Sequence, residues 1–185
     1  MGLRQLKRRI QLDRKNALKR FERHRRINFS AAPGIHPFIV VLDHLKPNFN
    51  VGKIFRSADA FGACEVHLIG TDFFDPAPAK GSFKWVPCRF FDGFDACCQD
   101  LREREYHLFL LDPEAKNSLF NCRFPSRSAF IFGHEEFGFS FDPSDYPRIN
   151  TISVPQYGRV QSLNVSIAAS LAMYEYVRQN NAASG

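Results

Sequence analysis

The stretch Phe38-Ile39-Val40-Val41-Leu42 is an unbroken apolar run with the length of one strand. A strand that is apolar on both faces is typical of a parallel sheet covered by helices on both sides. The next segment, 50–61, carries apolar residues at helical spacing, and Gly62 stands where that helix would end. Because a strand followed by a helix is the repeating unit of α/β folds, this region predicts an α/β domain.

The same alternation continues along the chain. The patterns predict further strands at 65–69, 106–111, 129–132 and 151–154, and helices at 92–104 and 162–179. The last of these helices carries Leu163, Ile167, Leu171 and Tyr174 on one line. Residues 70–84 are expected to be irregular because prolines and glycines interrupt them. We therefore predict a mostly parallel sheet flanked by helices.

Length and composition exclude several classes of protein. The chain has 185 residues, of which 44% are apolar and 24% charged, as expected for one globular domain. No stretch approaches the roughly 18 apolar residues of a membrane span, and the N-terminus lacks the apolar core of a secretory signal. The five cysteines form no Cys-x-x-Cys pair. This favours a reduced, cytoplasmic protein over a disulfide framework or a zinc site, and we expect no metal and no membrane association.

The positive charge is concentrated at the N-terminus. Residues 1–28 contain eleven Lys and Arg and two acidic residues, a net charge of +9, whereas the remainder carries −3. Residues 3–26 predict a helix whose narrow apolar stripe consists of Leu3, Leu6, Ile10, Ala17 and Phe21. Composition divides the chain into a basic helical arm at 1–30, a main domain at 36–180 and a disordered tail at 181–185.

Common catalytic and nucleotide-binding motifs are absent from the sequence. It contains no G-x-G-x-x-G loop, no P-loop and no G-x-S-x-G nucleophile elbow. His134-Glu135 begins an H-E-x-x-H pattern, but Gly138 occupies the position of the second histidine. The sequence therefore argues against dinucleotide binding, P-loop NTP hydrolysis, zinc proteolysis and serine hydrolysis.

Three segments combine glycines or polar side chains with the ends of expected strands and the starts of expected helices. Residues 50–56 read Asn-x-Gly-x-Ile-x-Arg at the start of the first helix of the main domain. Residues 133–138 read Gly-x-Glu-x-x-Gly directly after a strand, where α/β sheets bind ligands, although this segment taken alone favours an acidic turn that simply reverses the chain. Residues 162–166 read Ser-Leu-Asn-Val-Ser at the start of the last helix.

Local physics accounts for only part of these segments. Asn50 is placed to cap its helix, and Arg56, six residues later, is compatible with an ordinary surface arginine. Ser162 is expected to cap the last helix. Capping by Ser162 leaves Asn164 unexplained, because a polar side chain just inside an apolar helix needs a partner.

Together the three segments resemble the three motifs of the SpoU/TrmH branch of the SPOUT superfamily, the RNA 2′-O-ribose methyltransferases. The resemblance extends from about residue 38 to residue 179. It implies a parallel α/β domain with a C-terminal trefoil knot that holds S-adenosylmethionine, and a homodimer with the active site at the subunit interface. The implied reaction transfers a methyl group from S-adenosylmethionine to a ribose 2′-hydroxyl of structured RNA. The small size of the chain and its short basic arm favour tRNA over rRNA as the substrate.

The resemblance also implies roles for residues of this chain. The implied catalytic residues are Asn50, Arg56, Glu135, Ser162 and Asn164. The implied cofactor-binding positions are Leu111, Gly133, Val154, Gly158 and Leu163. The chain departs from the family pattern at His134 and at Glu136, which adds a second acid. Residues 80–85 follow that pattern only loosely, so no role is carried over to them.

RNA binding is expected from two parts of the chain, and neither membranes nor DNA are expected as partners. The arm offers Arg8, Arg9, Lys19, Arg20 and Arg23 to RNA phosphates, and the main domain offers Arg56, Arg159 and Lys84. For the arm, a solvated helix or a strap across a dimer is the alternative. For the whole chain, the alternatives are a catalytically inactive RNA-binding protein on the same scaffold and a different nucleotide-handling α/β enzyme.

Overall fold

The computed structural model describes residues 3–47 and 49–181, so the ends of the expected arm and tail, 1–2 and 182–185, lie outside the described residues. The strands are β1 (His36–Asp43), β2 (Ala63–Ile69), β3 (Cys88–Phe91), β4 (His107–Leu111), β5 (Asn117–Ser118), β6 (Ser128–Phe132) and β7 (Ile149–Ser153). They form one sheet in the order β3-β2-β1-β6-β4-β7-β5, and every pairing is parallel. The expected parallel sheet is confirmed.

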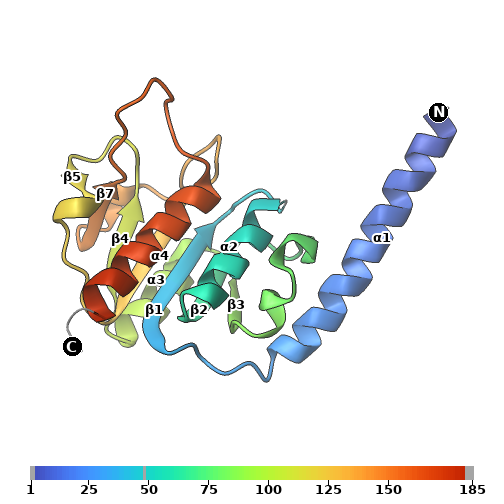
Figure 1. The fold of residues 1–185 in the computed structure, drawn as a ribbon, viewed down its shortest axis with the longest axis horizontal. Coiled ribbons are helices and arrows are strands. Elements are labelled where there is room, and N and C mark those ends of the chain that lie inside the picture. The colour runs from blue at the N-terminus through green and yellow to red at the C-terminus, as the bar shows by residue number, and fades with distance from the viewer. Residues whose placement is uncertain (1–2, 48, 182–185) are drawn as a thin grey trace.

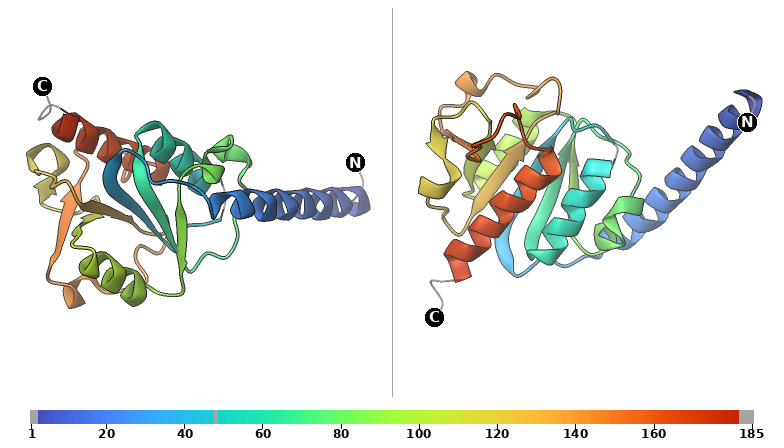
Figure 2. Two further views of the ribbon diagram at one scale, coloured as in Figure 1. Left: turned by 90° about the horizontal axis from the view of Figure 1, so that it is seen from below. Right: turned by 45° about the horizontal axis from the view of Figure 1, so that its top comes forward.

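Helices cover both faces of this sheet (Figures 1 and 2). The four α-helices are α1 (Leu3–Asn28), α2 (Phe49–Ala60), α3 (Phe94–Glu103) and α4 (Val165–Asn181). Between these elements lie short 3-10 helices at η1 (Ala77–Ala79), η2 (Ser82–Lys84), η3 (Leu119–Asn121) and η4 (Pro143–Asp145). In β1, Phe38, Val40 and Leu42 belong to the core under α2 and α4, whereas Ile39 and Val41 belong to the core under α3. The apolar run is therefore buried on both faces, as its composition predicts.

The structure corrects several boundaries and adds two strands. Strand β3 lies within a stretch without a predicted strand, and the two-residue β5 has no apolar pattern of its own. Both are edge strands, held by pairing with β2 and β7 rather than by burial. Helix α4 begins at Val165 instead of 162, so the expected N-cap at Ser162 is wrong.

The apolar line predicted along the last helix does not face the core. Ile167 and Tyr174 are 51% and 55% exposed, and Leu171 is 38% exposed. The small residues Ala169 and Ala172 face inward instead, where they let α4 pack closely on the sheet. Large apolar side chains are thus left on the outer surface of α4.

The arm contacts the main domain only through its C-terminal half and projects away from it at the N-terminus (Figure 1). Ala17, Phe21, His24 and Asn28 are buried at spacings of four and three residues, whereas Leu6 is 42% exposed. The expected apolar stripe is therefore covered only along its second half, and the side chains of Leu3 and Ile10 lie outside the described set.

Asn28 fixes the end of the arm to the main domain. Its Nδ2 donates to the carbonyl oxygens of Phe83 at 2.7 Å and Val86 at 2.6 Å, and its Oδ1 accepts from the Cys88 amide at 3.1 Å. Because Asn28 is only 7% exposed, these bonds are shielded from competing water. This buried amide therefore fixes the end of the arm, and the packing of Phe21 against Phe74 and Phe83 holds the part of the helix before it.

Other sequence-based expectations stay predictions: the trefoil knot and the division of the chain into arm, main domain and tail. The five cysteines are free thiols.

Within 3–47 and 49–181, no helix combines the length and the apolar content required to cross a lipid bilayer.

A buried polar cluster joins α3 to the sheet. The fully buried imidazole of His67 lies 2.8 Å from Glu65 Oε2 and 3.4 Å from the Cys97 sulfur. Arg104 donates to both oxygens of Glu65, at 2.8 and 2.9 Å. Burial lowers the pKa of His67 and raises that of Cys97, so both groups are neutral at pH 7. The cluster is structural, because a buried neutral thiol is a poor nucleophile.

Glu65 makes the stability of the fold depend on pH. Burial alone would raise its pKa, but hydrogen bonds from His67 and Arg104, together with the charge of Arg104, lower it to about 2. A carboxylate with a lowered pKa stabilises the fold above its ordinary value of 4.5 and loses that contribution as the pH falls toward 2. We expect Glu65→Gln to lower the free energy of unfolding at pH 7 by about 2–3 kcal/mol and to flatten its decline below pH 4.5.

Urea unfolding at a series of pH values measures this effect. The exposed Glu114→Gln serves as the control and should retain the slope of the parent protein. Equal slopes for the parent and Glu65→Gln would show that the carboxylate of Glu65 carries none of the acid sensitivity.

Candidate active site

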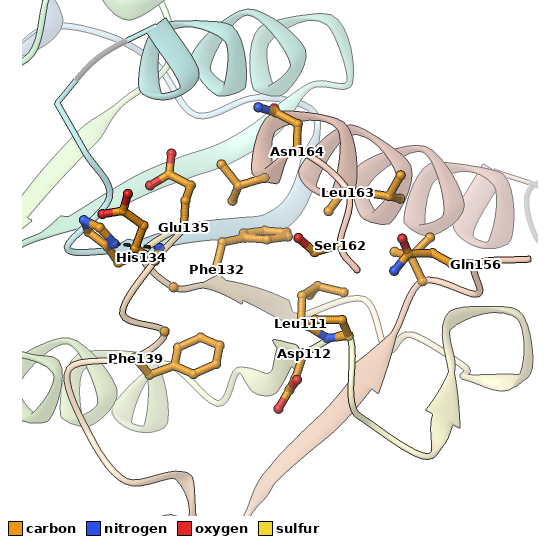
Figure 3. Close-up of a pocket in the computed structure, with 17 residues that line it drawn as sticks. Leu111, Asp112, Phe132, His134, Glu135, Phe139, Gln156, Ser162, Leu163 and Asn164 are labelled. Atoms are coloured by element: carbon orange, nitrogen blue, oxygen red, sulfur yellow. Dashed lines mark hydrogen bonds between the residues drawn. The ribbon is translucent and has the colours of Figure 1, made fainter. Parts of the chain in front are cut away.

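A cavity of about 610 Å³ opens at the carboxyl ends of β4, β6 and β7, and the loop before α4 closes one side of it (Figure 3). This is the edge at which parallel α/β sheets bind ligands. The apolar side chains that line it are Leu111, Phe132, Phe139, Val154, Leu163, Val165 and Ala168. The polar ones are Asp112, His134, Glu135, Glu136, Gln156, Ser162 and Asn164. The cavity therefore has an apolar wall and a rim of carboxyl, amide and hydroxyl groups.

Backbone geometry explains both glycines of the turn at 133–138. The amide of His134 donates to the carbonyl oxygen of Gly138 at 2.6 Å, and the return bond measures 3.0 Å. A Cβ at Gly133 would lie 2.6 Å from that same carbonyl oxygen. Gly138 has a φ of +72°, which side chains disfavour. The turn can close this tightly only with glycine at both ends.

A buried carboxylate holds the segment that follows this turn. Asp43, at the end of β1, is fully buried and accepts from the amide of Ser140 at 2.6 Å and from its hydroxyl at 2.7 Å. Nδ1 of His44 lies 2.8 Å from Oδ1 of Asp43, the same oxygen that accepts from the Ser140 hydroxyl. Asp43 was missed in the sequence, although an acid directly after a buried apolar strand is a signal for this edge of the sheet.

One chain of hydrogen bonds connects the three motifs. Asn50 Nδ2 donates to Glu135 Oε1 at 2.7 Å, and Asn164 Nδ2 donates to Asn50 Oδ1 at 3.3 Å. Asn50 lies inside α2 and directs its side chain at the other two motifs, so its expected role as a helix cap is wrong. Residues that are 114 positions apart in sequence thus meet at the rim of the cavity.

Asn164 also caps the last helix. Its Oδ1 accepts from the amide of Ser166 at 3.0 Å and from the Ser166 hydroxyl at 2.6 Å. Its carbonyl oxygen accepts from the amides of Ile167 and Ala168. The capping role expected of Ser162 therefore belongs to Asn164, and Ser162 is left to line the cavity.

The charges at the rim are mainly negative. Oε2 of Glu136 forms an ion pair with Nζ of Lys46 at 2.8 Å. The hydrogen bond and the positive charge of Lys46 lower the pKa of Glu136. His134 Nδ1 accepts from the amides of Glu136 at 3.0 Å and Phe137 at 3.2 Å, so the ring proton is carried by Nε2. Because Glu135 and Asp112 border the same cavity, its rim favours a cationic ligand group.

The expected cofactor-binding positions mostly gather at this cavity. Leu111, Gly133, Val154 and Leu163 line it, and so do the expected catalytic residues Glu135, Ser162 and Asn164. Gly158 lies in the exposed loop between β7 and α4 and is not part of the lining.

Among the expected catalytic residues, Arg56 is the one that the structure separates from the others. It is exposed on α2 and does not line the cavity. The neighbouring residue Ser57 faces α4, where its hydroxyl lies 2.7 Å from that of Ser170. The guanidinium of Arg56 therefore lies on the outward side of the two packed helices.

The expected RNA-binding cations differ in their availability. Arg8, Arg9, Lys19 and Arg23 are exposed along α1, and Arg159 is exposed in the loop before α4. Arg20 instead pairs with Asp75 at 2.9 Å. The arm thus presents free positive charge mainly beyond its contact with the main domain.

Sequence reasoning also missed two polar residues of the cavity. Asp112 and Gln156 follow the ends of β4 and β7, a position that marks ligand sites in α/β sheets. The Oε1 atom of Gln156 is buried without a hydrogen-bond partner in the protein. An unpaired buried acceptor beside a cavity is what a ligand donor would satisfy.

Comparison with known proteins gives this geometry a context. The chain is 30% identical over 146 residues to tRNA (guanosine(18)-2′-O)-methyltransferase of Thermus thermophilus, covering 76% of this chain and 74% of the relative. It is 26% identical over 151 residues to 23S rRNA (guanosine-2′-O-)-methyltransferase RlmB of Neisseria meningitidis, covering 77% and 59%. Several curated relatives are longer: the chain spans about 60% of those from Bacillus subtilis and Salmonella typhi.

Solved structures show the same fold. The SpoU methyltransferase AviRb from Streptomyces viridochromogenes, in complex with AdoMet, superposes with a TM-score of 0.71 at 28% identity, covering 80% of this chain and 60% of AviRb. A TrmH/SpoU tRNA modifying enzyme from A. aeolicus has a TM-score of 0.72 at 24% identity, covering 88% and 85%. The model of the SpoU rRNA Methylase family matches residues 37–174, and the chain therefore belongs to this family.

Proposed function

We propose that this protein transfers a methyl group from S-adenosylmethionine to a ribose 2′-hydroxyl of RNA. The observation that carries the proposal is the hydrogen-bonded series Asn164–Asn50–Glu135, which joins all three motifs at one cavity. The named relatives that methylate guanosine in tRNA and 23S rRNA support this reaction class. The free thiols agree with activity in a reducing compartment such as the cytoplasm.

The cavity fits S-adenosylmethionine in size and chemistry. Its volume of about 610 Å³ lies within the range of small-molecule sites. Leu111, Val154 and Leu163 would cover an apolar base, and the unpaired Oε1 of Gln156 would accept from an amino group of the ligand. The acidic rim around Glu135 suits a positively charged ligand. When bound, S-adenosylmethionine supplies an electrophilic methyl group on a cationic sulfur.

The protein's own contribution is mainly orientation. Holding reacting atoms in line at roughly 3–3.5 Å can supply up to about 7–11 kcal/mol. The Asn50–Glu135 bond ties the turn at 133–138 to the first turn of α2, and Asn164 orients both α4 and Asn50. The apolar wall excludes water, and it does not oppose a reaction in which a positive charge disappears. Ser162 is placed to hydrogen-bond the incoming ribose.

Arg56 contributes to RNA binding in this proposal rather than acting as a base. A guanidinium stays protonated in proteins, so it cannot readily accept the hydroxyl proton. It can bind a phosphate through two parallel hydrogen bonds, which fixes the neighbouring ribose. The proton would then leave through that phosphate.

A second copy of the chain would bring Arg56 to a cavity. Helices α2 and α4 run side by side, in contact at Asn50–Asn164 and at Ser57–Ser170. The helical period places Arg56 and Phe49, which is 69% exposed, on the outward side of α2. The exposed line of Ile167, Leu171 and Tyr174 lies beside them on α4. We propose that this combined surface forms a homodimer, with Arg56 serving the cavity of the partner subunit.

The RNA class is proposed as tRNA, on the ground that the chain carries a short basic arm and the Thermus thermophilus relative acts on tRNA. A catalytically inactive RNA-binding protein remains the second candidate. The complete set of Glu135, Ser162 and Asn164 around one cavity favours the enzyme, because RNA binding alone does not require it.

The cofactor site is tested by two glycine substitutions. Gly133→Ala should weaken S-adenosylmethionine binding at least tenfold, because the new Cβ would lie 2.6 Å from the Gly138 carbonyl oxygen and force the turn open. Gly93→Ala is the matched control, since a Cβ there meets nothing within 4 Å. Isothermal titration calorimetry with S-adenosylmethionine measures both. Absence of binding to the parent protein would contradict the proposed function.

Arg56→Lys tests the role of the guanidinium. Lysine keeps the charge but loses the two-pronged hydrogen bond, so the rate of RNA methylation should fall about 10- to 100-fold while cofactor affinity stays unchanged. Arg123→Lys, an exposed residue near the opposite end of α4, is the control. The measurement is incorporation of labelled methyl groups into unmodified tRNA transcripts. Parental activity in Arg56→Lys would refute the geometric role.

A charged substitution on the exposed line of α4 tests the proposed dimer surface. Ile167→Asp places a carboxylate at the N-terminal end of the exposed line and should shift the protein to a monomer in sedimentation velocity runs, with loss of methyl transfer. Phe120→Asp is the control, because Phe120 is 63% exposed on η3, away from this surface. A parent protein that sediments as a monomer, or a dimer unaffected by Ile167→Asp, would exclude this interface.

A further inference from the structure

A second hollow lies where the arm joins the main domain. It measures about 310 Å³ and is lined by Ile27, Ser30, Ala31, Ala32, Lys84 and Trp85. These residues come from the last turn of α1, the linker that follows it and the end of η2. None of them lines the cavity at the strand ends. The hollow is therefore a separate surface feature, at the point where α1 leaves the main domain (Figure 1).

Trp85 presents a large aromatic surface at this hollow. It is the only tryptophan of the chain and is 56% exposed. The ammonium of Lys84 lies 4.8 Å from the centre of its ring. An indole left open to solvent beside a hollow is a stacking platform for another flat ring.

The platform stands on a rigid base. Phe83 and Val86, on either side of the Lys84–Trp85 pair, are buried in the core. Their carbonyl oxygens both accept from Nδ2 of Asn28, and the Trp85 amide donates to Ser82 at 2.8 Å. The amide that fixes the end of the arm thus also fixes the backbone that carries Trp85. Arm and platform form one preorganised unit.

Positive charge surrounds this unit. Arg23 and Arg26 are exposed in the last two turns of α1, close to the hollow. His24, between them, has its pKa lowered by burial and further by the charges of Lys84, Arg23 and Arg20. Arg20 is paired with Asp75, and Lys84 and Arg23 are the other two cations whose charges act on His24. Arg23 lies on the segment 1–28, whose net charge is +9, and Lys84 lines the hollow from η2.

We propose that this junction hollow is an RNA-binding subsite, in which one nucleobase stacks on Trp85 while Lys84 and Arg23 bind the adjoining phosphates. The inference rests on the proposed function for the identity of RNA as the ligand. Every nucleobase offers a flat π face and every nucleotide a phosphate, so an aromatic platform among cations binds single-stranded RNA with little sequence preference. The density of positive charge favours this polyanion over a protein partner.

Because Trp85 is the only tryptophan in the sequence, its fluorescence reports directly on binding at the subsite. The full-length protein is titrated with a single-stranded 12-nucleotide oligouridylate, and the emission of Trp85 is recorded. Stacking should quench the emission by about half or more. An abasic phosphodiester strand of the same length keeps the phosphates but has no bases, so it should bind more weakly and leave the emission nearly unchanged.

Two substitutions separate stacking from folding. Trp85→Leu should weaken oligouridylate binding about 5- to 100-fold in filter-binding assays, whereas Trp85→Phe should retain most of the affinity, because it keeps an aromatic face. Lys84→Gln should reduce the slope of log affinity against log salt by about 0.7, the value for one phosphate contact on a single strand. Circular dichroism confirms that each variant is folded before it is compared.

Three results would overturn the subsite: binding of oligouridylate without quenching, equal quenching by the abasic strand, or equal affinity of Trp85→Leu and the parent. An emission change that follows protein concentration without RNA would instead assign the hollow to a second copy of the chain. Failure here is distinct from failure of the proposed function. If the protein binds S-adenosylmethionine and methylates RNA while the emission of Trp85 does not change, only the subsite is refuted. If RNA quenches the emission but S-adenosylmethionine does not bind, only the proposed methyltransferase function is refuted.

Discussion

The carboxylate of Glu135 is the point on which the site depends, because it accepts from Asn50, which in turn accepts from Asn164. Each partner belongs to a different motif: a helix start, a strand-end turn and a helix cap. Removing Asn50 would break both bonds, and removing Glu135 or Asn164 would break one of them at the rim of the cavity. The three motifs therefore act as one structural unit, which explains why each is uninformative when taken alone.

This unit is held in place by the sheet below it. The parallel strands bring the ends of β1, β4, β6 and β7 to one edge, and Asp43 ties the turn after β6 to the end of β1. The tight turn at 133–138 then presents Glu135 outward. Rigid strands and one buried carboxylate thus supply the preorganisation that an in-line reaction requires.

The chain separates its tasks in space. The cavity is acidic and partly apolar, whereas the arm is strongly basic and meets the main domain only at its C-terminal half. Opposite charges in separate places allow a cationic small molecule and a polyanionic RNA to be attracted to different surfaces of one protein. The outward faces of α2 and α4, which carry Arg56 beside an exposed apolar line, are a third surface with its own chemistry.

The sequence by itself determined the alternation of strands and helices, the parallel sheet, the basic helix and the residue types of the three motifs. These follow from local periodicity and composition, which record whether a position faces solvent or the core. Only the tertiary structure decided that β6 lies between β1 and β4, that Asn164 rather than Ser162 caps α4, and that Asp43 and Gln156 belong to the site. Strand order and contacts across a hundred residues depend on which surfaces meet after collapse, and no local pattern encodes that choice.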